Sequence, residues 1–267
     1  MIEELLIRPA AYFADRADAG RALAAELEGE GGPELVVLGL ARGGVEVAAE
    51  VARALAAPLD VVAVRKIGHP LQPEYGIGAV TPGDGIYVRG PNGLTEEELA
   101  AAVEASKAKA AQLDARLHAE HGPLGLAGKT VLLVDDGLAT GGTMIAALRW
   151  AKTADAARLV AAVPVAAEDS LELVRKEADE VVCLYPLAAF LAVGIWYRSF
   201  EQVDDAEVAR LLGQNRRDRA ALRQGSKAGT AGRARGQGSD TCRRREPRSR
   251  TRGFRRPSER GDWGSCR

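Results

Sequence analysis

Short apolar segments alternate with longer amphipathic segments along the first 185 residues of this chain. The short segments are rich in Val and Leu and apolar at successive positions, which is typical of strands covered on both faces. They predict strands over residues 34–40, 60–66, 130–136, 157–166 and 180–185. The segments between them have apolar residues at helical spacing. These predict helices over residues 15–28, 44–56, 95–120, 142–153 and 168–178.

Two local signals add detail to this pattern. Thr95 and Glu98 have the spacing of a capping box at the start of the third helix. Residues 79–89, AVTPGDGIYVR, predict a hairpin that turns between Pro82 and Gly85. The alternation of strands and helices predicts an α/β fold with a mainly parallel sheet flanked by helices. Ligands of such sheets bind at the carboxyl ends of the strands.

Charge divides the chain near residue 212. Residues 1–212 contain 19 Lys and Arg against 32 Asp and Glu, and residues 213–267 contain 17 against 5. The formal net charge of −1 therefore hides two opposite excesses. The second part has few apolar residues and no periodicity, so it is predicted to be disordered. We expect one folded domain over residues 1–212 and an Arg-, Gly- and Ser-rich tail over residues 213–267.

Two interpretations of the tail stay open. Its arginines could attract nucleic acid nonspecifically by neutralising phosphates. The abrupt change of composition is also expected of translated read-through or of a shifted frame. The N-terminus lacks a signal-peptide pattern, the chain has no apolar run of membrane-spanning length, and its three cysteines have no metal-binding spacing. A cytoplasmic protein without a membrane segment is expected.

The sequence VLLVDDGLATGGT, residues 131–143, carries the chemistry that stands out most. Asp135 and Asp136 come at the carboxyl end of a predicted central strand, and residues 137–143 form the turn into the next helix. Backbone N–H groups of such a turn can hold a phosphate. The lysine of a nucleoside-triphosphate loop is missing. Carboxylates beside a phosphate are suited to holding hydroxyl groups or hydrated Mg²⁺, and a ribose 5-phosphate meets both requirements.

This run resembles the phosphoribosyl-pyrophosphate signature of the type I phosphoribosyltransferases. The resemblance implies that Asp135 and Asp136 bind the 2- and 3-hydroxyls of the ribose and hold Mg²⁺, mainly through water. It also implies which residues wrap the 5-phosphate. They are Ala139, Thr140, Gly141, Gly142 and Thr143.

Two further loops match the family's order. The loop GLARGGV, residues 39–45, corresponds to the family's diphosphate-binding loop, which implies binding by the backbone of Gly43 and Gly44 and by the charge of Arg42. The segment VRKIGHP, residues 64–70, corresponds to a place where the family often has a basic residue near the diphosphate. Arg65 and Lys66 are the candidates there, Lys66 more strongly. With Asp135 and Asp136, Lys66 completes the expected catalytic group.

The resemblance covers residues 1 to about 210 and implies transfer of the phosphoribosyl group from phosphoribosyl pyrophosphate to a nucleobase or a similar nitrogen nucleophile. A homodimer is a further expectation from the family. The hood, the variable segment that selects the acceptor in the family, corresponds to residues 186–205. Its aromatic residues either stack on a base or close the core under the last helix. They are Phe190, Trp196, Tyr197 and Phe200.

Two other functions are compatible with parts of this pattern. The same fold serves regulators that sense phosphoribosyl pyrophosphate or nucleotides without catalysis, although the acidic residues 1–212 do not suit a nucleic-acid-binding face. Enzymes that synthesise phosphoribosyl pyrophosphate carry two such domains, and this chain offers one.

Overall fold

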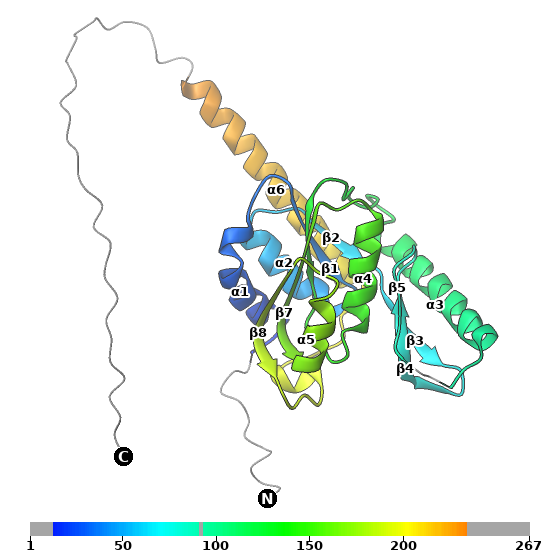
Figure 1. Ribbon diagram of the computed structural model, residues 1–267. Coiled ribbons are helices and arrows are strands. Elements are labelled where there is room, and N and C mark those ends of the chain that lie inside the picture. The colour runs from blue at the N-terminus through cyan, green and yellow to red at the C-terminus, as the bar shows by residue number, and fades with distance from the viewer. Residues whose placement is uncertain (1–12, 91–92, 234–267) are drawn as a thin grey trace, which may run out of the picture. The chain divides into compact units, whose positions relative to one another are not determined.

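A five-stranded parallel sheet forms the centre of the structure (Figure 1). The computed structural model describes residues 13–90 and 93–233, with side chains up to residue 224. The strand order is β2-β1-β6-β7-β8, and neighbouring strands are parallel throughout. The predicted α/β fold is therefore confirmed. The strands are β1 Leu35–Leu40, β2 Leu59–Val62, β6 Thr130–Val134, β7 Arg158–Ala167 and β8 Glu180–Leu187.

Helices cover both faces of this sheet (Figure 1). Successive strand residues point to opposite faces, so Val37 enters one core, and Val36 and Leu38 enter the other. Among the described residues, no helix has the length and apolarity needed to cross a membrane. The first core includes α1 Arg16–Glu26, α2 Gly43–Ala54 and part of α6 Asp205–Arg233. The second includes α4 Gly142–Thr153 and α5 Glu168–Val174. Two short 3₁₀ helices are η2 Glu28–Glu30 and η3 Val193–Trp196.

A second, antiparallel sheet consists of β3 Arg65–His69, β4 Gln72–Val80 and β5 Ile86–Val88. The predicted hairpin over residues 79–89 is confirmed, because β4 pairs with β5 across its turn. The prediction of one strand over residues 60–66 is wrong at its end. The parallel strand stops at Val62, and the chain crosses to the other sheet before Arg65. Residues 63 and 64 are buried, so the apolar pattern continues while the pairing partner changes.

The long helix α3 Glu96–Leu117 packs on the second sheet and also reaches the first core. It begins with the predicted capping box. Glu98 N donates to Thr95 Oγ1 at 3.2 Å, and Thr95 N donates to Glu98 Oε2 at 2.9 Å. Leu113 and Leu117, in its last turns, are buried in the core that contains α2. The helix therefore connects the two sheets.

A buried polar contact fixes the end of α3 to β2. Asp60 is only 2% exposed, and its Oδ1 lies 3.2 Å from His118 Nε2. Its Oδ2 accepts a hydrogen bond from Leu124 N at 2.6 Å. The hydrogen bond that His118 donates to Asp60 raises the pKa of His118, against the effect of burial. A protonated His118 thus compensates a carboxylate that would otherwise be buried without a counter-ion.

The C-terminal part of the chain differs from the expected boundary at residue 212. α6 runs from Asp205 to Arg233, so residues 213–233, predicted to be disordered, are helical. Two hydrogen bonds of a polar side chain are part of the reason for this helix. Asn215 Oδ1 accepts from Leu59 N at 2.9 Å, and its Nδ2 donates to Ala57 O at 3.1 Å. These bonds satisfy backbone groups at the start of β2, which a composition argument cannot detect. The rest of the predicted tail, residues 234–267, lies outside the described residues.

The pH dependence of stability tests the Asp60–His118 contact. Its charge-dependent part should be complete below about pH 6.5, the ordinary pKa of histidine, and lost as the pH rises through the raised folded pKa. We expect His118→Gln to lower the free energy of unfolding by about 2 kcal/mol at pH 6, measured by urea denaturation, and by clearly less at pH 8.5. His121→Gln is the control, because that side chain is exposed. Equal losses at both pH values would contradict the proton linkage.

Candidate functional site

Two adjacent carboxylates follow the central strand. β6 ends at Val134, and Asp135 and Asp136 come directly after it at the carboxyl edge of the parallel sheet, as predicted. Asp136 N donates to Asp135 Oδ1 at 2.9 Å, so the first carboxylate is oriented by the backbone of the second. Both residues are half-buried. Two negative charges thus stand side by side where solvent reaches them only in part.

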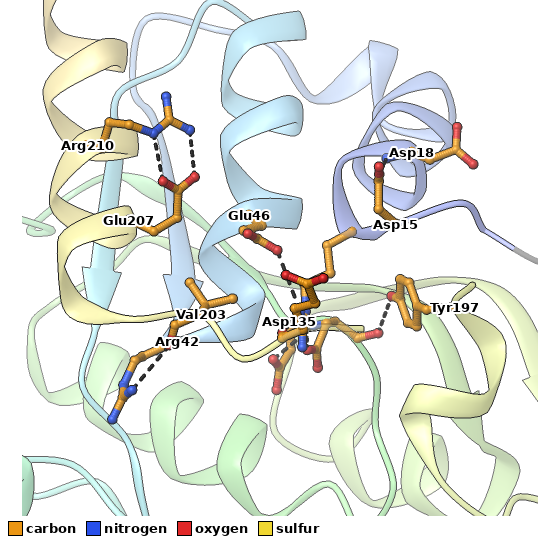
Figure 2. A network of polar contacts seen from close by, with 12 residues as sticks. Asp15, Asp18, Arg42, Glu46, Asp135, Tyr197, Val203, Glu207 and Arg210 are labelled. Atoms are coloured by element: carbon orange, nitrogen blue, oxygen red, sulfur yellow. Dashed lines mark hydrogen bonds and ion pairs between the residues drawn. The ribbon is translucent and has the colours of Figure 1, made fainter. Parts of the chain in front are cut away.

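A buried arginine from α1 compensates the second carboxylate. Arg16 is 7% exposed, and its Nε donates to Asp136 Oδ2 at 2.8 Å. Its Nη1 donates to Glu201 O at 2.7 Å, and its guanidinium lies 3.8 Å from the centroid of the Phe200 ring. Glu46 Oε2 is 3.6 Å from the same Nη1. The network in Figure 2 therefore joins α1, α2, the end of β6 and the segment before α6.

The start of α2 comes directly against the carboxylates. A Cβ atom on Gly43 would lie 2.2 Å from Asp136 Oδ2, and one on Gly44 would lie 2.7 Å from Val134 O. Only glycine permits this approach. The predicted loops at residues 39–45 and 131–143 are thus in contact, and the positive end of a helix faces the acidic strand end. The Ala41–Arg42 peptide bond, just before α2, is cis.

The loop after Asp136 is anchored on both sides and leads into α4. Leu138 N donates to Val165 O at 3.0 Å, and Ser170 Oγ donates to Ala139 O at 2.9 Å. Gly141 has φ +72°, a left-handed conformation that glycine adopts without strain, and α4 begins at the next residue. The first N–H groups of a helix have no acceptor within the helix. Residues 139–143, with Ala139 and Thr140 exposed, therefore form a loop at a helix N-terminus that could hold an anion, and this loop is called the anion cradle.

Lys66 lines two pockets, and residues of the cradle line the same two pockets. One pocket, of about 270 Å³, is lined by Lys66, Thr140, Gly142 and Thr143 together with β4 and β5 residues. The other, of about 1030 Å³, is lined by Lys66, Thr143 and one face of α3. The positive charge of Lys66 also opposes the raised pKa of both Asp135 and Asp136. This predicted site residue is thus close to the carboxylates and to the cradle.

The side chains of Arg42 and Arg65 lie near Asp205 and not beside the paired carboxylates. Arg42 Nη1 donates to Val203 O at 3.2 Å, and its Nε lies 3.2 Å from Asp205 Oδ1. Arg65 precedes Lys66 on β3, and adjacent strand residues point to opposite faces. Its electrostatic neighbours are Arg42, Arg116 and Asp205. The two predicted arginines therefore gather around Asp205, away from the paired carboxylates.

Burial shapes the protonation of the site. Desolvation, and then the charge of Asp136, raises the pKa of Asp135 well above its usual value. Desolvation also raises the pKa of Asp136, against the hydrogen bond from Arg16. Burial raises the pKa of Tyr197 as well, so its hydroxyl stays neutral and donates to Asp136 O at 2.6 Å. Burial makes the ionised forms of Asp135 and Asp136 unfavourable in the free site. A ligand or cation that pairs with these carboxylates would reduce that cost.

The aromatic residues of the expected hood pack mostly in the core. Trp196 and Tyr197 are 6% and 5% exposed and form a cluster with Phe13. Phe190 is partly buried against the same cluster. Phe200 carries the guanidinium of Arg16 on its ring. Of the two alternatives, core packing therefore holds for Trp196 and Tyr197.

A match to a protein-family model identifies the family of this chain. The model of the phosphoribosyl transferase domain matches residues 11–193, well over half of the chain. The chain belongs to the phosphoribosyl transferase family.

Individual relatives agree with this assignment. A Mycobacterium tuberculosis protein named "Putative phosphoribosyl transferase Rv0571c" is 43% identical over 211 residues, which cover 77% of this chain and 47% of that relative. The chain thus spans about half the length of the curated relatives it matches. The crystal structure of TT1426 from Thermus thermophilus is 39% identical and superposes with a TM-score of 0.65, covering 75% of this chain and 97% of that one.

The sequence did not reveal which residues hold the signature loop of this phosphoribosyl transferase domain in place. Arg16, Tyr197 and Ser170 contact it from α1, the segment after η3, and α5. No local motif marks them, because each acts through a partner 31 to 120 residues away. The one signal in the sequence was that two adjacent acids at a buried strand end need a cation, and the cations that the motifs offered were Arg42, Arg65 and Lys66.

The Arg16–Asp136 pair makes a measurable contribution to stability. We expect Arg16→Gln to lower the free energy of unfolding by about 3 kcal/mol, because it leaves a half-buried carboxylate without its counter-ion. Guanidinium chloride denaturation measures this. Arg21→Gln is the matched control on the same helix, since the Arg21–Asp18 pair is exposed and should matter by roughly 0.5 kcal/mol or less. A loss no larger than that of Arg21→Gln would show that the pair does not compensate Asp136.

Proposed function

We propose that this domain transfers the 5-phosphoribosyl group from phosphoribosyl pyrophosphate to a nucleobase or similar nitrogen nucleophile, with release of pyrophosphate. The single observation that carries the proposal is the contact between the paired carboxylates, the anion cradle and the start of α2 at one edge of the sheet. The proposal extends to a cytoplasmic location and a homodimer, the expectations drawn from the sequence.

In this proposal the sugar phosphate spans the signature loop. Residues 139–143 bind the 5-phosphate through backbone N–H groups and the helix N-terminus. Asp135 and Asp136 accept hydrogen bonds from the ribose 2- and 3-hydroxyls. One oxygen of Asp136 is already bonded to Arg16, which holds the carboxylate in a fixed orientation. Arg16 is thus a positioning residue, and the sugar takes the remaining acceptor capacity.

The diphosphate would lie toward α2 and β3. Gly43 and Gly44 let the start of α2 approach the carboxylates closely, and the N–H groups in the first turn of α2 have no acceptor within the helix. Lys66 borders both pockets and supplies a positive charge to the leaving group. Arg42 joins the diphosphate only if it exchanges its present contacts with Val203 and Asp205. Charge development on the leaving pyrophosphate would be stabilised by these fixed groups.

Magnesium fits the residues present. Within the described residues, no cluster of three or more His, Cys, Asp and Glu forms a metal site, but Mg²⁺ characteristically uses one or two carboxylates, several waters and substrate phosphates. Asp135 and Asp136 supply those carboxylates, and their raised pKa values reflect charge that a cation would offset. When bound, Mg²⁺ would neutralise the diphosphate and orient it for departure.

Binding and release together test the proposal. We expect the full chain to bind phosphoribosyl pyrophosphate in calorimetric titration with Mg²⁺, and to release pyrophosphate in the presence of one or a few nucleobases. Binding without release from any acceptor would favour the alternative, a protein that senses phosphoribosyl pyrophosphate or nucleotides. No binding would contradict both.

Asp136→Asn tests the ribose contact. This change keeps the size of the side chain but removes the charge, and we expect the Kd for phosphoribosyl pyrophosphate with Mg²⁺ to rise about tenfold or more. Asp169→Asn, at an exposed position of α5, is the control and should leave the Kd unchanged. Equal affinities of the two variants would remove Asp136 from the binding site.

A further inference from the structure

The larger pocket beside Lys66 extends well beyond the space that a diphosphate needs. Its volume is about 1030 Å³, and much of its lining comes from one face of α3. Three cationic side chains line it outside the carboxylate site, namely Arg65, Lys109 and Arg116. Glu98 also lines it, but the carboxylate of Glu98 is engaged by the capping box of α3. The pocket therefore has an excess of positive charge.

Arg65 is the least satisfied of these cations. Its Nε is buried, and no hydrogen-bond acceptor for it exists among the described residues. Burial and the positive charges of Arg42 and Arg116 lower the pKa of Arg65, and Asp205 opposes them. A guanidinium remains charged under these conditions, so a buried donor without an acceptor is costly. An anion in the pocket would remove that cost.

Asp205 lies outside the lining of the pocket and pairs with Arg116, which lines the pocket, and with Arg42, which does not. Asp205 Oδ2 accepts from Arg116 Nε at 2.9 Å, while Asp205 Oδ1 lies 3.2 Å from Arg42 Nε without hydrogen-bond geometry. Asp205 is the first residue of α6, and the helix cap is made by its neighbour Asp204, which accepts from Glu207 N at 2.7 Å. Asp205 is thus free to release the arginines without uncapping the helix.

We propose that the α3 side of this pocket is a second anion-binding site, which takes a phosphate group of a small molecule and in which that phosphate competes with Asp205 for Arg116. The site goes beyond the proposed transfer reaction and does not depend on it. Arg65 and Lys66 both line the pocket, but Lys66 acts on Asp135 and Asp136, whereas Arg65 acts with Arg42, Arg116 and Asp205. The two cationic groups therefore serve different anions.

Phosphate titration of the full chain tests the site. We expect inorganic phosphate to bind, Arg116→Gln and Lys109→Gln to weaken that binding by about tenfold and threefold, and Asp205→Asn to strengthen it by about threefold. Lys107→Gln is the matched control, because Lys107 is on α3 but does not line the pocket. It should change nothing. Phosphate held only by the cradle at residues 139–143 would not respond in opposite directions to changes at residues 116 and 205.

The same variants separate a second anion from the substrate's own diphosphate. We expect Arg116→Gln and Lys109→Gln to leave the Kd for phosphoribosyl pyrophosphate with Mg²⁺ within about twofold of the original. Parallel losses for phosphate and phosphoribosyl pyrophosphate would place these residues in the diphosphate site and overturn the inference. So would unchanged phosphate affinity in Arg116→Gln, or the lack of any phosphate binding even in Asp205→Asn. If phosphoribosyl pyrophosphate fails to bind at all, the transferase proposal fails, and the phosphate results still decide this site.

Discussion

Two carboxylates stand together at the end of a buried strand, and one buried arginine compensates the second of them. This constraint organises the surrounding elements. Arg16 can reach Asp136 only if α1 lies beside α2, and the same guanidinium holds Glu201 O and the Phe200 ring. The segment before α6 is thereby tied to the end of β6. A buried ion pair contributes little net stability compared with apolar packing, but losing one partner is costly. The pair therefore specifies an arrangement more than it stabilises one.

The same constraint explains why the ionised forms of the two carboxyl groups are unfavourable in the free protein. Desolvation raises the pKa of both carboxylates, and Arg16 donates a hydrogen bond to Asp136 alone. Neutral residues at the two positions would pack with less electrostatic cost. Their charge is useful when a ligand supplies hydroxyl donors or a cation, because the interaction then takes place in a partly dry environment. Retaining two acids at this strand end favours binding over stability.

The second sheet and α3 bring the remaining charges to this edge. Asp60 and His118 attach the end of α3 to β2, and the larger pocket beside Lys66 lies between α3 and β3. Alternation along β3 sends Lys66 toward the carboxylates and Arg65 toward Asp205. One short strand thus divides its two cations between the paired carboxylates and the arginines around Asp205. Asp205, at the start of α6, is the shared counter-ion of Arg42 and Arg116.

The sequence by itself determined the alternating elements, the parallel sheet and the loop after Asp135 and Asp136. These depend on local periodicity, turn residues and strand ends, which neighbouring residues decide. Tertiary structure decided where β2 ends. Residues 63 and 64 are buried, so their apolar pattern is the same whether the strand continues or the chain crosses to the other sheet. It also decided that helix continues past residue 212, through the bonds of Asn215 to the start of β2. The partner of Asp136 comes from 120 residues away, and Arg42 turns to Asp205. Charge pairing depends on which side chains meet in space, and no spacing within one segment records that.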